Sequence, residues 1–175
     1  MTFPKREIAE FAILFSIAYL FKIVFVQAWF SVQTLTIIIT VWAFLKSIYF
    51  IFENSTQLLI ATSEDIAYHK FLFLMTYNIG QMTLSFAIDF FCLYEVDKSS
   101  FVGVMPEFGK IEEAFEFFYF SILNFTFFGY GDLMPATVAA KLIVLLEIII
   151  AFLTIIFILS DFISMKDSLR KLKKS

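Results

Sequence analysis

The chain has 175 residues, of which 61% are hydrophobic, 20% aromatic and only 17% charged, and its mean hydropathy is +0.87. Soluble domains are closer to half apolar and a quarter charged, so this composition excludes an ordinary water-soluble domain and makes membrane lipid the expected surroundings. The net charge of −3 is too small, and the basic residues are too concentrated at the two chain ends, for a nucleic-acid-binding protein.

Four apolar stretches are long enough to cross a bilayer, which takes about 20 residues of helix. They cover residues 8–30, 32–52, 71–94 and 138–162. The sequence therefore predicts an all-α, multi-pass membrane protein with four transmembrane helices. Lysine and arginine gather before the first stretch, before the third and after the fourth, which places both termini in the cytoplasm by the positive-inside rule.

The polar segment 53–70 joins the second and third stretches on the expected cytoplasmic side. Ser63, followed by Glu64 and Asp65, is either the N-cap of a helix that continues into the third span or part of a plain loop. Serine is common both at helix N-caps and in loops, so the sequence leaves both alternatives open.

Two lysines lie within the first two stretches. Lys46 lies near the end of the stretch 32–52, and we expect its ammonium to reach the cytoplasmic headgroups. Lys22 lies deeper, and either pairs with Asp89 of the third stretch or reaches the outer interface. A voltage-sensing helix needs several arginines at every third position, so this hairpin is not expected to sense voltage.

A fifth apolar stretch, 114–128, is too short to cross the membrane and ends in a Gly-Tyr-Gly turn. That combination is typical of a re-entrant helix followed by a loop. Glu112, Glu113 and Glu116 crowd the first turn of this helix, where carboxylates complement the positive end of the helix dipole. The partly negative carboxyl end of the helix then points into the membrane.

Gly129 and Gly131 flank Tyr130 directly after this helix. Glycine permits backbone conformations that align successive carbonyl oxygens, and four such strands would form rings that replace the hydration shell of a cation. One chain cannot form a ring, so this interpretation requires a tetramer. The tripeptide alone would equally suit an ordinary turn between two helices.

The residues around this turn resemble the pore module of the potassium-channel family. The family pattern is Tyr-Phe-Ser, six residues that include threonines, Val-Gly-Tyr-Gly-Asp, and a proline three residues after the aspartate. The matching residues are Tyr119, Phe120, Ser121, Gly129, Tyr130, Gly131, Asp132 and Pro135. The resemblance extends over residues 71–162 and includes the order outer helix, pore helix, filter and inner helix.

The resemblance implies an ion filter made of Thr126, Phe127, Phe128, Gly129, Tyr130, Gly131 and Asp132. The carbonyls of Phe127, Phe128, Gly129 and Tyr130 would hold K⁺. Two positions depart from the family, which has threonine and valine where this chain has Phe127 and Phe128. Phe127 removes a hydroxyl ligand from the innermost ion site, and Phe128 requires more room behind the filter.

The resemblance also assigns roles to the inner helix and its neighbours. An apolar gate would be formed by Phe152, Ile155, Ile156 and Leu159, although the same residues could simply pack in the bundle. Glu147 lies deep in the membrane on the side of the pore helix, and we expect it to support the filter as a buried brace toward Asn124 or the filter backbone. Asn124 stands where the family usually has threonine.

The expected domains are an N-terminal transmembrane hairpin with its cytoplasmic connection (1–62), a pore domain (63–165) and a basic cytoplasmic tail (166–175). The leading hypothesis is a passive potassium channel of four identical subunits, with no cofactor besides K⁺ in the filter. A weakly selective channel for monovalent cations and a non-conducting channel-like subunit remain alternatives. The sequence offers no paired aspartates at matching depth and no Ser-His or metal-ligand cluster, so an enzyme is not expected.

Overall fold

The computed structural model describes residues 30–63, 68–105, 107, 109–129 and 131–172. Its elements are α2 (Val32–Ser63), α3 (Tyr68–Val96), η1 (Lys98–Ser100), β1 (Phe101–Val102), α4 (Lys110–Phe125), β2 (Met134–Pro135) and α5 (Val138–Leu172). The predicted first span, including Lys22, lies outside the described residues.

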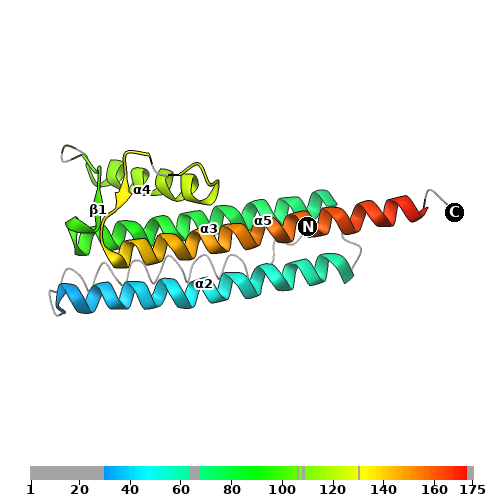
Figure 1. Cartoon of the computed structure of the whole chain (residues 1–175), viewed down its shortest axis with the longest axis horizontal. Coiled ribbons are helices and arrows are strands. Elements are labelled where there is room, and N and C mark those ends of the chain that lie inside the picture. The colour runs from blue at the N-terminus through cyan, green and yellow to red at the C-terminus, as the bar shows by residue number, and fades with distance from the viewer. Residues whose placement is uncertain (1–29, 64–67, 106, 108, 130, 173–175) are drawn as a thin grey trace.

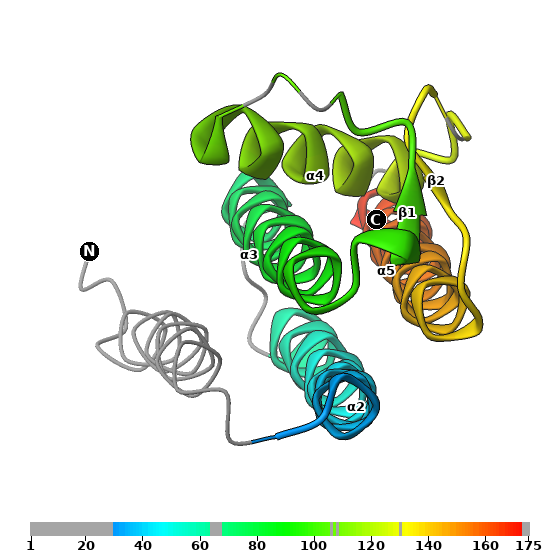
Figure 2. The ribbon, with the colours of Figure 1, turned by 90° about the vertical axis from the view of Figure 1, so that its left-hand side faces the viewer.

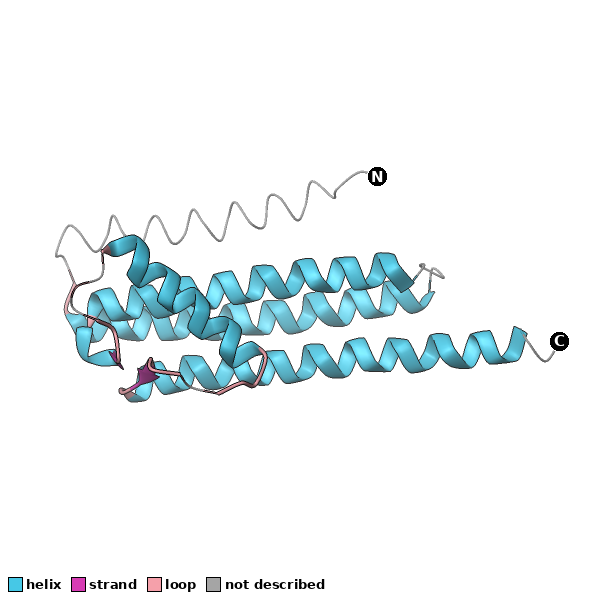
Figure 3. Ribbon diagram, turned by 90° about the horizontal axis from the view of Figure 1, so that it is seen from above, coloured by secondary structure: helices cyan, strands magenta, loops and turns pink. Residues whose placement is uncertain are grey.

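Among the described helices, α2, α3 and α5 are long and apolar enough to cross a membrane, over Val32–Gln57, Leu72–Val96 and Val138–Ser160. The three run side by side along the long axis of the molecule (Figures 1 and 2). The shorter α4 crosses α3 and α5 obliquely, on the side of the bundle away from α2 (Figures 2 and 3). The chain is thus a mostly helical membrane protein.

Four phenylalanines pack the middle of α4 against α3 and β1. Phe101 packs edge-on against Phe117 and Phe120 with ring centroids 5.1 and 5.8 Å apart, and Phe90 packs in the same way against Phe120 at 5.2 Å. All four rings are at most 3% exposed. Such aromatic pairs add about 0.5–1.5 kcal/mol each beyond the apolar area that they bury.

Helix α2 is longer than the apolar pattern indicates. It starts at a turn where the N–H of Thr34 donates to the Ser31 hydroxyl at 3.2 Å, and it runs without a break to Ser63. Both readings of Ser63 were therefore wrong, since Ser63 ends α2 instead of capping α3 or lying in a loop. Residues 53–63 contain no glycine or proline, so nothing in them stops the helix.

Because α2 continues to Ser63, Lys46 lies in the middle of the helix and not near its end. The residue is only 4% exposed. Its ammonium forms an ion pair with the Asp89 carboxylate of α3, donates to the Ser85 carbonyl at 3.0 Å and lies 4.9 Å from the centre of the Phe86 ring. The prediction that Lys46 reaches the headgroups was wrong. The partner of Asp89 within the described chain is Lys46.

A second set of polar contacts joins α2 to both α5 and α3. The Asn54 side-chain amide of α2 donates to the Thr154 hydroxyl of α5 at 2.9 Å, and the Asn78 side-chain amide of α3 donates to Oδ1 of Asn54 at 3.3 Å. All three side chains are buried. Polar contacts thus fix α2 against both α3 and α5, in addition to the apolar packing.

We predict that Lys46→Met destabilises the protein by about 3–5 kcal/mol, because it leaves the Asp89 carboxylate buried without its cationic partner. The measurement is denaturant unfolding of the purified protein in detergent. Lys98→Met is the matched control, since Lys98 also pairs with a carboxylate and covers an aromatic ring but has a side chain that is 52% exposed. The control should lose about 1 kcal/mol or less. Equal losses in the two variants would contradict the prediction.

Candidate functional site

The segment that contains α4 leaves the helix bundle and returns to it at the same end. Strand β1 precedes α4 and pairs in antiparallel fashion with β2, which follows the loop after α4, so that Phe101 lies opposite Pro135 and Val102 opposite Met134. Residues 103–133 therefore make an excursion that begins and ends at the same place (Figure 1). The first span-length helix after this excursion is α5.

A glycine closes the base of the excursion. Gly103 has a φ of 98°, and a Cβ built on it would lie 1.9 Å from the carbonyl oxygen of Asp132. Only glycine fits both the conformation and the contact. The segment before α4 and the end of the loop after it are thus held in direct backbone contact.

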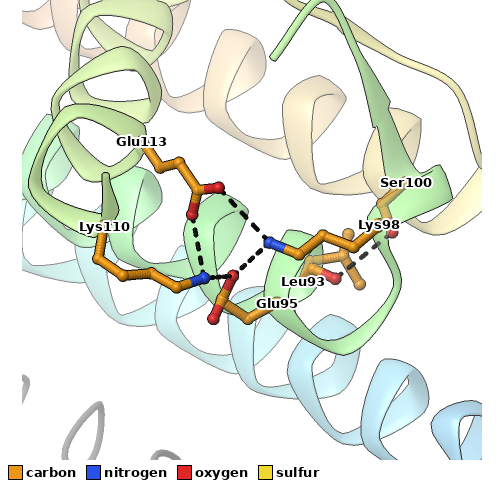
Figure 4. Close-up of polar contacts among 6 residues, drawn as sticks. All are labelled: Leu93, Glu95, Lys98, Ser100, Lys110 and Glu113. Atoms are coloured by element: carbon orange, nitrogen blue, oxygen red, sulfur yellow. Dashed lines mark hydrogen bonds and ion pairs between the residues drawn. The ribbon is translucent and has the colours of Figure 1, made fainter. Parts of the chain in front are cut away.

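Four charged residues secure the start of α4 to the end of α3 (Figure 4). The Lys110 ammonium donates to Glu95 at 2.6 Å and to Glu113 at 3.1 Å, and Lys98 pairs with the same two carboxylates at 2.5 and 3.7 Å. The hydrogen bond to Glu95 raises the pKa of Lys110 above its usual value. The two positive and two negative charges of this group cancel.

The carboxyl end of α4 is closed by its own backbone. The N–H of Phe128 donates to the Leu123 carbonyl at 3.0 Å and the N–H of Phe127 donates to the Asn124 carbonyl at 3.1 Å. This pair of bonds is the Schellman motif, which places the residue after the C-cap in the left-handed region and usually uses glycine there. Here that residue is Phe127, with a φ of 57°.

The predicted filter residues follow this helix end. Thr126, Phe128, Gly129, Gly131 and Asp132 are exposed, and Phe128 is 85% exposed. The side chain of Phe127 is 46% exposed, and Tyr130 lies outside the described residues. The rest of the described chain therefore leaves this loop uncovered.

The hydroxyl of Thr126 is turned away from the loop. It donates back to the Ile122 carbonyl of α4 at 2.8 Å. Thr126 therefore does not replace the hydroxyl that the family has at position 127.

Behind the loop, Glu147 of α5 meets α4. Its Oε2 accepts from the Asn124 amide at 3.1 Å, and its Oε1 contacts the Ser121 hydroxyl, which also lies 2.8 Å from the Thr83 carbonyl of α3. Glu147 is 1% exposed. The expected contact with Asn124 is present. The contacts of Ser121 were not anticipated, although its hydroxyl, between the phenylalanines of the short apolar stretch, was the signal that could have indicated them.

The predicted gate residues lie partly on one face of α5. Phe152, Ile156 and Leu159 are exposed and Ile155 is half-buried. The exposed residues belong to a longer apolar stripe of Val138, Leu142, Leu145, Ile149, Phe152, Ile156 and Leu159. Steps of four and three residues alternate along this stripe, which is the spacing of helices that pack against each other in a coiled coil.

A family model described as an ion channel matches residues 73–166, just over half of the chain. The match begins in α3, contains the whole excursion with α4 and its loop, and ends in α5. The chain belongs to this ion-channel family. Helix α2, with Lys46 and Asn54, precedes the matched channel module. No curated protein matched the chain, and no solved structure matched it.

Within this channel module, the strain at Phe127 is open to a direct test. We predict that Phe127→Gly is more stable than Phe127→Ala by about 1 kcal/mol, because both variants lose the ring but only alanine retains the cost of the left-handed conformation. Thermal unfolding in detergent measures the difference. The same pair of substitutions at Phe128, which lacks a positive φ, should give the opposite order, with alanine the more stable. A preference for alanine at both positions would contradict the helix end described above.

Proposed function

We propose that the chain is a potassium channel subunit that conducts K⁺ passively in a homotetramer, with the loop after α4 as the ion filter and both termini in the cytoplasm. The observation that carries this proposal is the excursion 103–133, because it lies wholly within the ion-channel family match. A helix that enters and a loop that returns at the same end of the bundle are what a re-entrant pore segment requires.

The backbone of the loop supports an ion-binding role. Positive φ occurs at Phe127 and at Gly129 but not at Phe128 between them. Glycine adopts the positive φ at position 129 without strain, which suits a backbone whose carbonyl oxygens line an ion path. In the proposed filter, the carbonyls of Phe127 to Tyr130 coordinate dehydrated K⁺, and Asp132 lies at its outer end.

Assembly into a tetramer accounts for the apolar surface that a single chain leaves uncovered. Ile111, Phe115 and Tyr119 form an exposed row on α4, Phe128 extends from the loop, and the apolar stripe runs down α5. In the tetramer, the outer part of the stripe and the row on α4 contact neighbouring subunits. The inner part, with Phe152, Ile156 and Leu159, lines the cavity and forms a gate that closes by excluding water.

We predict that Gly129→Ala abolishes K⁺ flux in liposomes that contain the purified protein, because a Cβ is strained at its φ of 87°. Gly80→Ala is the matched control, since Gly80 lies in α3 with nothing within 4 Å of an added Cβ and alanine favours helix. The control should conduct as the unchanged protein does. Flux that survives Gly129→Ala would remove the loop from the conduction path.

The same liposomes distinguish potassium selectivity from its alternatives. Potassium flux that exceeds sodium flux supports a selective filter despite Phe127 and Phe128. Equal fluxes would support a weakly selective monovalent cation channel, as the missing hydroxyl at position 127 suggests. No flux from correctly assembled protein would favour a non-conducting subunit.

We predict a mass of four chains for the purified protein in native mass spectrometry. Replacing Leu142 with lysine should lower that number, because its side chain lies in the exposed apolar stripe. Phe44→Lys is the matched control, since Phe44 is similarly exposed on α2, outside the family match. A tetramer that tolerates lysine at position 142 would contradict the role given to the stripe.

A further inference from the structure

Four helices meet in one buried polar cluster behind the loop. Lys46 comes from α2, Asp89 from α3, Ser121 from α4 and Glu147 from α5, and each of these side chains is at most 6% exposed. Lys46 pairs with Asp89, and Ser121 contacts Glu147. This cluster lies within the membrane-spanning part of the bundle, where a charged side chain is costly. The protonation state of each ionisable group in it therefore matters.

The hydroxyl of Ser121 has a single proton but two oxygen neighbours. One neighbour, the Thr83 carbonyl at 2.8 Å, can only accept a hydrogen bond. The other neighbour is Oε1 of Glu147. If Ser121 donates to the carbonyl, its contact with Glu147 is satisfied only when Oε1 carries a proton and donates to the serine oxygen.

The second oxygen of Glu147 fits the same arrangement. Oε2 accepts from the Asn124 amide at 3.1 Å, as the carbonyl oxygen of a neutral carboxylic acid would. A protonated Glu147 therefore uses one oxygen as a donor and the other as an acceptor. Each of the three polar groups from α3, α4 and α5 then has a partner of the correct kind.

The charge count leads to the same conclusion. Asp89 is directly paired with the Lys46 ammonium, so these two residues balance each other. The groups of α4 that face Glu147, Ser121 and Asn124, are neutral. An ionised Glu147 would leave one negative charge unbalanced in a buried site, whereas a protonated Glu147 leaves the cluster neutral.

We propose that Glu147 is a proton-holding site, in which a neutral carboxylic acid donates through Oε1 to Ser121 and accepts through Oε2 from Asn124. Its role is that of a positioning residue, since it fixes α4, and hence the start of the loop, to α5. This inference concerns the bundle of a single chain and does not depend on ion conduction. A failure of the flux experiment would leave it intact.

Infrared spectroscopy tests the proposal directly. A protonated carboxylic acid has a carbonyl-stretch band that ionised carboxylates lack. At neutral pH, exposed carboxyl groups, with ordinary pKa values of about 4, are ionised and do not contribute to it. The purified protein, in a detergent without ester groups, should show this band. Glu147→Gln should remove it. The matched control, Lys46→Met combined with Asp89→Asn, removes both charges of the neighbouring pair and should retain it.

Glu147→Gln is expected to fold, because its amide can donate to Ser121 and accept from Asn124 as the acid does. A second variant, Ser121→Ala, should keep the band but shift its frequency, since the acid loses the oxygen to which it donates. The absence of the band from the unchanged protein, or its persistence in Glu147→Gln, would overturn the proposal. Loss of the band in the double variant, with retention in Glu147→Gln, would place the proton on Asp89 and overturn it as well.

Discussion

The hydroxyl of Ser121 joins three helices in a part of the bundle where water cannot replace a lost partner. It touches the Thr83 carbonyl of α3 and the Glu147 carboxyl of α5 while its own backbone belongs to α4. Any shift of α4 would separate these groups and leave buried oxygens without a hydrogen bond, which costs about 1–3 kcal/mol for each group. The depth at which α4 ends, and with it the position of the loop, depends on this contact.

Two different kinds of packing hold the middle of α4 and the part of it that leads to the loop. Its middle, at Phe117 and Phe120, is held by aromatic packing against Phe90 and Phe101. Its second half is held by the directional hydrogen bonds of Ser121 and Asn124. Directional contacts therefore lie nearest the loop, where a candidate ion site needs accurate positions, and the less directional packing lies farther away.

The lengths of the apolar stretches predicted the third and fourth spans well. A helix that crosses lipid must form its backbone hydrogen bonds internally, and the thickness of the bilayer sets its length. The apolar stretch continued to residue 128, whereas α4 ends at Phe125, because Phe127 gives no sign of the left-handed turn that stops the helix. Lys46 was misplaced for a related reason. Its depth was judged from an apolar stretch that ended at residue 52, whereas α2 continues through polar residues to Ser63. Which lysine meets Asp89 depends on how two helices align, and a single sequence does not record that alignment.

The continuity of α5 gives the carboxyl end of this helix a mechanical property. With 35 residues, α5 is about 52 Å long, whereas the hydrocarbon layer is about 30 Å thick. Its apolar span ends at Ser160, and the same helix continues without interruption to Leu172. This extension acts as a rigid lever. A sideways force applied near residue 172 is carried directly to Phe152 and Ile156, and no flexible joint between them absorbs it.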